Sequence, residues 1–249
     1  GGFGRFCVAA ETDIGNASRP INDKERAACA EKGREPIEFR VGTDALAIVV
    51  NPANAFLTDV STEQLAKIFS SEATNWSDVD PNWPDAPILR FSPGTDSGTF
   101  DYFVEAVMKP TFVITTTDAG NGGKEILGAA NLQLSEDDNV LVQGIEGDAN
   151  AIGYFGYAYY LENADKLKIL SVNGVEPNET TAENGEYPLA RPLFIYSAKS
   201  VIDEKPQVGE FINFYLTFVN EEIGDVGYFP ASAEALNEAK ANLLAVINQ

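Results

Sequence analysis

The sequence predicts an α/β protein with largely parallel sheets. Segments with the apolar pattern of strands alternate along the chain with segments of helical period, as in folds that cover a sheet with crossover helices. The run 45–50 is continuously apolar, which is typical of a strand buried on both faces. Helix-start signals recur, as at Asn22, where Glu25 follows three residues later. A chain of 249 residues has room for one or two domains.

Hydrophobic period, capping residues and turn residues place the individual elements in order. The expected strands are 13–17, 36–41, 45–50, 88–91, 151–155, 167–172 and 191–197. Helices are expected after the caps Asn22 and Ser61, from Phe100 onward, and over 123–131, 135–147, 156–163, 206–220 and 232–247. The polar stretch 173–187 is expected to be a loop with one turn.

The charge of the chain is strongly negative, with 38 acidic and 17 basic residues and a formal net charge of −21. Binding to a nucleic-acid backbone needs a basic surface, so nucleic acid is not an expected partner. Attraction to an anionic membrane surface is disfavoured for the same reason. No run of 18 apolar residues occurs, so no segment of this chain is expected to insert into a membrane.

The chain contains no histidine and two cysteines, Cys7 and Cys29. Without histidine, the usual general base and the commonest metal ligand are missing, and two cysteines alone cannot complete a zinc site. We therefore expect no catalytic residue, no metal and no cofactor. Cys7 and Cys29 form either a disulfide, which would indicate an oxidising compartment, or two buried free thiols.

The segment Ser97-Gly98-Thr99 follows a predicted strand and opens a predicted helix. The first amide groups of a helix lack intrahelical acceptors and carry partial positive charge, which suits an anion. Gly98 would allow close approach to the backbone, and the two hydroxyls would add donors. Arg90, in the preceding strand, could offer a forked cation to an oxyanion. The alternative is an ordinary helix cap, with Arg90 in a surface ion pair.

A second candidate, Ser18-Arg19, also lies between a predicted strand and a predicted helix, although it could equally be a polar turn. The pair of junctions suggests two lobes that close on one small anion. Asp96 could select phosphate over sulfate, because a carboxylate repels sulfate but accepts a hydrogen bond from the proton of monohydrogen phosphate. Asp96 could instead cap the helix or pair with Arg90.

Two other groups of residues admit a functional interpretation. The aromatic side chains between 154 and 160 could form a platform for a sugar or a base, but core packing explains them more simply. Four acidic residues could bind calcium, yet their spacing is not that of an EF-hand, and solvated surface positions are the simpler interpretation. These four are Asp59, Glu63, Asp78 and Asp80.

In their order and their motifs, several segments of the chain resemble the phosphate-binding proteins of bacterial ABC transporters. The segments are 1–6, 13–21, 41–47, 57–76, 90–103, 152–155 and 187–193. The resemblance implies a two-lobed type 2 periplasmic-binding-protein fold with two crossover hinge strands, near 45–50 and 193–197. Lobe 1 would comprise 1–46 and 193–249, and lobe 2 would comprise 47–192.

By position, the resemblance assigns Ser97, Gly98 and Thr99 to the oxyanion-binding helix start and Arg90 to the binding arginine. Three additional residues separate Arg90 from Ser97 in this chain, so Arg19 is the alternative cation. Ser18 falls where members of the family have the aspartate that accepts the phosphate proton, which leaves Asp96 as the candidate acceptor. The resemblance also implies a strand-helix unit ahead of the matched segments, so lobe 1 is expected to be incomplete.

The function implied is the extracytoplasmic binding component of a phosphate ABC transporter, periplasmic or at the cell surface. It would bind inorganic phosphate between its lobes and work with a membrane permease. The alternatives are a binding protein or sensor for another tetrahedral oxyanion, a secreted phosphatase, or a structural surface protein that keeps the fold without the site.

Overall fold

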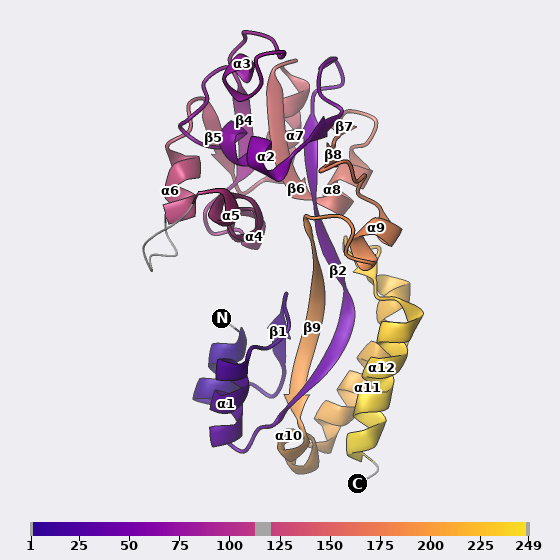
Figure 1. Cartoon of the computed structure of the whole chain (residues 1–249). Helices are drawn as coiled ribbons and strands as arrows, with labels where there is room; N and C mark the ends of the chain where they lie inside the picture. The colour runs from indigo at the N-terminus through magenta and orange to yellow at the C-terminus, as the bar shows by residue number, and fades with distance from the viewer. Residues whose placement is uncertain (1, 113–120, 248–249) are drawn as a thin grey trace. The chain divides into compact units, whose positions relative to one another are not determined.

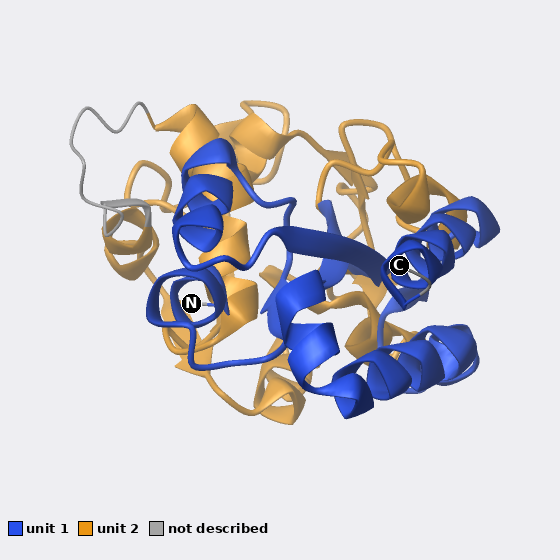
Figure 2. Cartoon of the chain, turned by 90° about the horizontal axis from the view of Figure 1, so that it is seen from below, with its two compact units in different colours: residues 1–44, 190–249 blue, residues 45–189 orange. Residues whose placement is uncertain are grey.

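The structure is a computed structural model that describes residues 2–112 and 121–247 (Figure 1). The chain forms two compact units, shown in different colours in Figure 2. Unit 1 comprises Gly1–Asp44 and Ala190–Gln249, and unit 2 comprises Ala45–Leu189. The lobe bounds expected from the sequence lie two residues from the first of these boundaries (46 against 44) and three from the second (193 against 190).

Unit 1 contains a small antiparallel sheet and several helices. Strand β1 pairs with β9, which neighbours β2, and β10 pairs with β2 through Thr43 and Gly42. The elements of this unit are η1 (Gly4–Ala9), β1 (Gly15–Ala17), α1 (Asp23–Glu31), the first part of β2 (Pro36–Val50), β9 (Ala190–Ala198), α10 (Lys199–Glu204), α11 (Pro206–Glu222), β10 (Phe229–Pro230) and α12 (Ala233–Ile247).

The predicted start of α1 is confirmed, since Asn22 and Glu25 form a reciprocal capping box. Gly33 follows this helix with a φ of 67°, a conformation that favours glycine. The disulfide alternative is also confirmed, because Cys7 and Cys29 are bonded to each other and fully buried. The bond joins η1 to α1 beside the main hydrophobic core of the unit.

Unit 2 is built around a mixed sheet in the order β2-β6-β4-β5, in which β4 runs parallel to both β5 and β6 and β2 runs antiparallel to β6. Strand β7 also pairs with β2, and helices α4, α7 and α8 pack against strands of the sheet (Figure 1). The elements are β3 (Asp59–Val60), α2 (Thr62–Ile68), α3 (Trp76–Val79), β4 (Leu89–Pro93), α4 (Gly98–Phe103), η2 (Val104–Met108), α5 (Lys109–Thr111), α6 (Asn121–Leu127), β5 (Leu132–Ser135), α7 (Asp138–Glu146), β6 (Ala151–Gly156), α8 (Tyr157–Glu162), β7 (Lys168–Ile169), β8 (Ser171–Val172) and α9 (Glu179–Glu183).

Helix α7 lies against the sheet of unit 2 at a point where glycines leave room for Phe91. A side chain at Gly144 would meet the Phe91 ring at 2.0 Å, and one at Gly153 would meet the Phe91 carbonyl oxygen at 3.0 Å. Phe91, Leu141 and Ile145 are buried in the same core. The helix can therefore approach the sheet closely only because these two positions lack a Cβ.

The structure corrects several expectations. The sheets are mixed rather than largely parallel, because β2, which the sequence divides at 42–44, continues unbroken from one unit to the other and is antiparallel to β6, β7 and β10. The expected loop 173–187 contains α9, and β5 and α10 occupy positions at which no such element is expected. Within the part of the chain that is described, no helix has both the length and the apolar character needed to cross a bilayer.

Candidate functional site

The candidate site lies at the edge of the unit 2 sheet where the parallel strands end. The register pairs Pro93 with Ser135 and Phe91 with Gly153, so the carboxyl ends of β4, β5 and β6 share one edge. A helix follows each strand: α4, α7 and α8 respectively. Ligands of α/β folds bind at this edge because helix N-termini converge there.

The start of α4 combines a capping serine with an exposed glycine. Ser97 is the N-cap, and its Oγ accepts the amide hydrogen of Thr99 at 3.2 Å. The Asp101 amide donates to the Ser97 carbonyl and is the first amide of α4 to find an acceptor one turn back. The Gly98 and Phe100 amides precede it and have no acceptor inside the helix. Gly98 is exposed, and a Cβ built on it would meet no heavy atom within 4 Å. The structure therefore brings together the Gly98 amide and the hydroxyls of Ser97 and Thr99 at one helix start.

Aromatic packing holds α4 in place behind this start. The Phe103 ring stacks on Tyr154 with 3.9 Å between centroids, and Phe69 packs edge-on against both rings. The Tyr154 hydroxyl lies 2.7 Å from Ser92 Oγ, whose own hydrogen is directed to the Pro93 carbonyl. Burial raises the pKa of Tyr154, so its hydroxyl stays protonated. The sequence shows the aromatic residues but gives no sign of the Ser92–Tyr154 hydrogen bond.

Carboxylates surround the turn ahead of α4. Asp96 lies in that turn and is exposed, while the Ser97 amide closes the turn by donating to the Gly94 carbonyl at 3.0 Å. The Glu136 carboxylate rests against Gly94, because a Cβ at that glycine would fall 1.7 Å from Glu136 Oε1. Burial, with Asp137 and Glu136 nearby, raises the pKa of Asp138 at the start of α7. The surroundings of the α4 start thus offer hydrogen-bond acceptors as well as donors.

Arg90 does not reach this site, and its prediction as the anion-binding cation is corrected. The side chain is fully buried in β4, where Nη2 donates to the Ala73 carbonyl at 2.6 Å and Nη1 to the Ala130 carbonyl at 2.5 Å. Nε donates to the Ile68 carbonyl. Burial lowers the pKa of Arg90 to about 10, which leaves it charged at neutral pH. Arg90 therefore links three chain segments of unit 2 rather than offering its fork to a ligand.

The other predicted pair, Ser18 and Arg19, belongs to unit 1 and directly follows β1. Arg19 forms a two-pronged ion pair with Glu25, with contacts of 2.9 and 2.7 Å, and its guanidinium lies 5.4 Å from the centroid of the Phe3 ring. The hydrogen bonds from Arg19 lower the pKa of Glu25. The Arg19 side chain is 49% exposed, so the pair does not hide it from a ligand.

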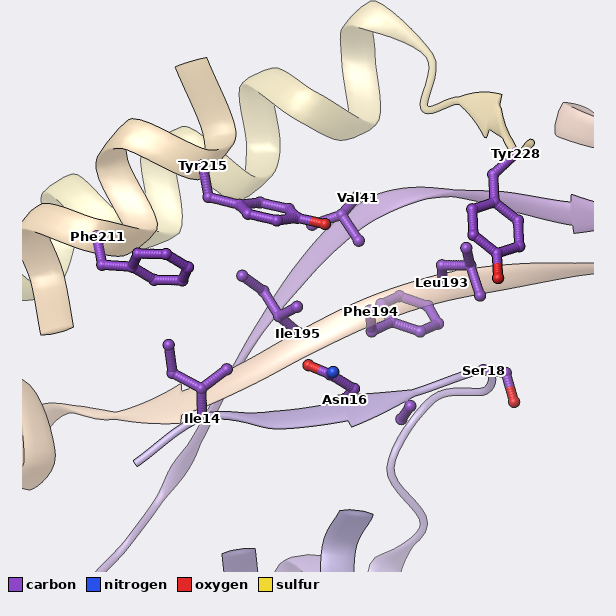
Figure 3. A pocket seen from close by; sticks show the side chains of 11 residues that line it. Ile14, Asn16, Ser18, Val41, Leu193, Phe194, Ile195, Phe211, Tyr215 and Tyr228 are labelled. Atoms are coloured by element: carbon purple, nitrogen blue, oxygen red, sulfur yellow. The ribbon is translucent and has the colours of Figure 1, made fainter. Parts of the chain in front are cut away.

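Ser18 also lies at the margin of an apolar groove of about 670 Å³ within unit 1. Figure 3 shows Phe211 and Tyr215 of α11 above this groove and side chains of β1, β2 and β9 below. Asn16, Ser18 and two tyrosine hydroxyls are the polar groups of its lining, and its described lining residues include no cation. The groove is thus poorly suited to a small anion.

The remaining candidate groups serve the fold. Tyr154 and Phe155 are fully buried, in agreement with core packing. Asp59 accepts the Gly174 amide, Asp78 accepts the Thr74 and Asn75 amides, and Asp80 accepts the Asn82 amide. Across residues 2–112 and 121–247, no three His, Cys, Asp or Glu side chains gather as a metal site.

Known proteins resemble this chain over nearly its whole length. A family model described as a PBP superfamily domain matches residues 6–217. Protein SphX of Synechococcus elongatus is 44% identical over 96% of this chain and 68% of its own length. The phosphate-binding protein PstS of Staphylococcus haemolyticus is 37% identical over 91% of the chain and 68% of its own length. The crystal structure of a possible phosphate binding protein from Planctomyces limnophilus has a TM-score of 0.82 at 38% identity, over 99% of this chain and 85% of that one.

Proposed function

Because the chain belongs to the PBP superfamily and, within it, to the family of phosphate-binding proteins, we propose that it binds inorganic phosphate as the solute-binding component of a phosphate ABC transporter. The observation that carries the proposal is the accessible start of α4. The Gly98 amide and the hydroxyls of Ser97 and Thr99 supply donors at a helix N-terminus, which favours a compact anion.

The net charge of −21 decides where the affinity must come from. A long-range field of this sign repels phosphate, but at physiological ionic strength it decays over about 8 Å. Short-range donors must therefore hold the ligand, and the association rate should rise as salt is added. Arg19 is the predicted cation for this purpose, since Arg90 is committed to backbone carbonyls.

Selectivity for phosphate over sulfate is assigned to an acceptor carboxylate, and Asp96 is the proposed one. Asp96 is exposed in the turn directly before Ser97, where a bound anion would meet it. Monohydrogen phosphate can donate its proton to a carboxylate, whereas sulfate would leave that acceptor unsatisfied at a cost of about 1–3 kcal/mol. Replacing Asp96 by asparagine should therefore narrow the preference for phosphate.

The proposed role is capture and delivery to a membrane permease outside the cytoplasm, without catalysis. The relative from Staphylococcus haemolyticus is named as a phosphate-binding protein, and a buried disulfide fits an oxidising compartment. A sensor or binding protein for another oxyanion is the alternative, and sulfate or arsenate outcompeting phosphate would identify it. Release of phosphate from a phosphomonoester would reveal a phosphatase.

The proposal is tested by equilibrium dialysis with labelled phosphate on the wild type and on two alanine variants. Ser97→Ala with Thr99→Ala removes the hydroxyls at the α4 start and should weaken binding at least about tenfold, because hydrogen bonds to a charged group contribute about 1.5–3 kcal/mol each. Ser61→Ala is the matched control, since Ser61 caps α2 by the same kind of bond, in which its Oγ accepts the Gln64 amide hydrogen. Equal affinities for all three proteins would refute the assignment.

A further inference from the structure

The chain passes between the two units at two places, Asp44–Ala45 and Leu189–Ala190. Side-chain and backbone contacts connect the two crossing segments on both sides of these boundaries. In unit 1, Arg191 Nε lies 3.0 Å from Asp44 Oδ2. In unit 2, the Leu46 amide donates to the Leu189 carbonyl at 2.9 Å. Ala45 and Ala190, with one methyl group each, lie between these two sets of contacts.

The ion pair of unit 1 is largely withdrawn from solvent, with the Asp44 side chain 11% and the Arg191 side chain 20% exposed. Asp44 lies in β2 and Arg191 in β9, which are neighbours in the sheet. Removal of the Arg191 guanidinium would leave the Asp44 carboxylate poorly solvated, and broken buried pairs of this kind are strongly destabilising. The pair therefore favours the arrangement in which these two strands lie side by side.

The contacts of unit 2 are more deeply buried than the ion pair of unit 1. The Tyr187 hydroxyl donates to the Leu46 carbonyl at 2.8 Å, and this ring is 1% exposed. Burial raises the pKa of Tyr187, which keeps its hydroxyl a neutral donor. Leu46 is thus held at its amide by Leu189 and at its carbonyl by Tyr187.

We propose that Asp44 and Arg191 form a clamp that holds β2 and β9 together where both leave unit 1, and that backbone rearrangement at the crossings is confined to Ala45 and Ala190. Hinges in two-lobed proteins are a few residues that absorb changes in φ and ψ, and small side chains accommodate such changes with few clashes. Asp44 and Arg191 are positioning residues in this account. They lie outside the proposed anion site.

Hydrogen exchange of the ligand-free protein tests the clamp. In Asp44→Asn and in Arg191→Gln, backbone amides of 41–46 and 190–194 should exchange at least about tenfold faster than in the wild type, because local opening there becomes easier. The double variant should exchange more slowly than the product of the single effects predicts, since both substitutions disrupt the same contact. Asp203→Asn is the matched control, because Asp203 forms an exposed ion pair with Lys199 in the same unit.

Several results would overturn the proposal: exchange in Asp44→Asn equal to that in Asp203→Asn, additive single effects, or acceleration spread evenly over unit 1. If Asp44→Asn does not fold, Arg191→Gln and Arg191→Lys decide the question. The lysine variant keeps the charge but not the guanidinium geometry, and it should exchange at an intermediate rate. Phosphate binding plays no part in these measurements, so a failure of the clamp and a failure of the proposed function are distinguishable.

Discussion

The rings of Phe103 and Tyr154 are stacked, with 3.9 Å between their centroids and 11° between their planes. The stack joins α4, which carries the candidate anion site at its start, to β6 in the sheet. The position of the α4 start therefore depends on packing one and a half turns further along the helical segment.

This relationship predicts different outcomes for two variants. Phe103→Ala should destabilise the protein by about 3–5 kcal/mol and weaken phosphate binding, because a buried aromatic ring that positions α4 is lost. Tyr154→Phe keeps the stack and removes only the hydrogen bond with Ser92, so it should cost about 1 kcal/mol and leave binding nearly unchanged. Urea unfolding and phosphate titration measure the two effects. Equal loss of binding in both variants would contradict the packing explanation.

Arg90 is predicted to be a structural residue. Arg90→Met should lower the free energy of unfolding by about 3–5 kcal/mol, since the carbonyls of Ile68, Ala73 and Ala130 lose their donor in a buried place. Protein that remains folded should bind phosphate as the wild type does, which dialysis below the unfolding transition can establish. A folded variant with severely weakened phosphate binding would show that Arg90 contributes to the anion site after all.

The disulfide should stabilise unit 1. Cys7 and Cys29 are separated by 22 positions in the sequence. Closing a loop of this length restricts the unfolded chain, so Cys7→Ser with Cys29→Ser should lower stability by about 3 kcal/mol. Thermal unfolding with and without a reducing agent provides the measurement. The reducing agent should lower the unfolding temperature of the wild type but not that of the double variant. Equal unfolding temperatures for the double variant and the oxidised wild type would contradict the prediction.

Asp138 should make stability fall as pH rises. Its pKa is raised above the ordinary value of 3.8, because burial and the carboxylates of Asp137 and Glu136 outweigh the favourable helix start. A carboxyl whose pKa is higher in the folded state contributes most below pH 3.8, and this contribution is lost as pH rises through the raised pKa. Asp138→Asn should therefore be more stable than the wild type at neutral pH.

Urea unfolding of both proteins at acidic and neutral pH tests this prediction, with Asp165→Asn as the control because Asp165 is exposed. The advantage of Asp138→Asn should shrink as the pH is lowered. A variant less stable than the wild type at neutral pH would mean that the charge at the start of α7 matters more than its burial.

Local signals allowed parts of this structure to be predicted. Two helix starts can be predicted from the sequence because both partners of each capping box lie within four residues. These partners are Asn22 with Glu25, and Ser61 with Gln64. The Ser97 cap is visible for the same reason. Such signals are local, and the residues that make the contact are close together in the sequence.

Other features depend on partners that are distant in the sequence. The sequence alone predicts an accessible cation at Arg90. The carbonyls that accept its hydrogen bonds belong to residues distant in the sequence, Ile68, Ala73 and Ala130, so no local pattern reveals them. Strand β5 has only four residues, Leu132–Ser135, so its alternation of apolar and polar side chains is too short to identify a strand, and it depends on pairing with β4. The continuity of β2 through Gly42 and Thr43 likewise depends on β10, whose residues Pro230 and Phe229 pair with these two.

Phosphate binding at the α4 start is tested most directly by following the amide resonances of Gly98 and Phe100 during a titration with inorganic phosphate. These two amides have no acceptor within the helix, so both signals should move in a saturable way, and sulfate should move them less at equal concentration. Saturable phosphate binding that leaves both signals in place would show that the anion is held elsewhere.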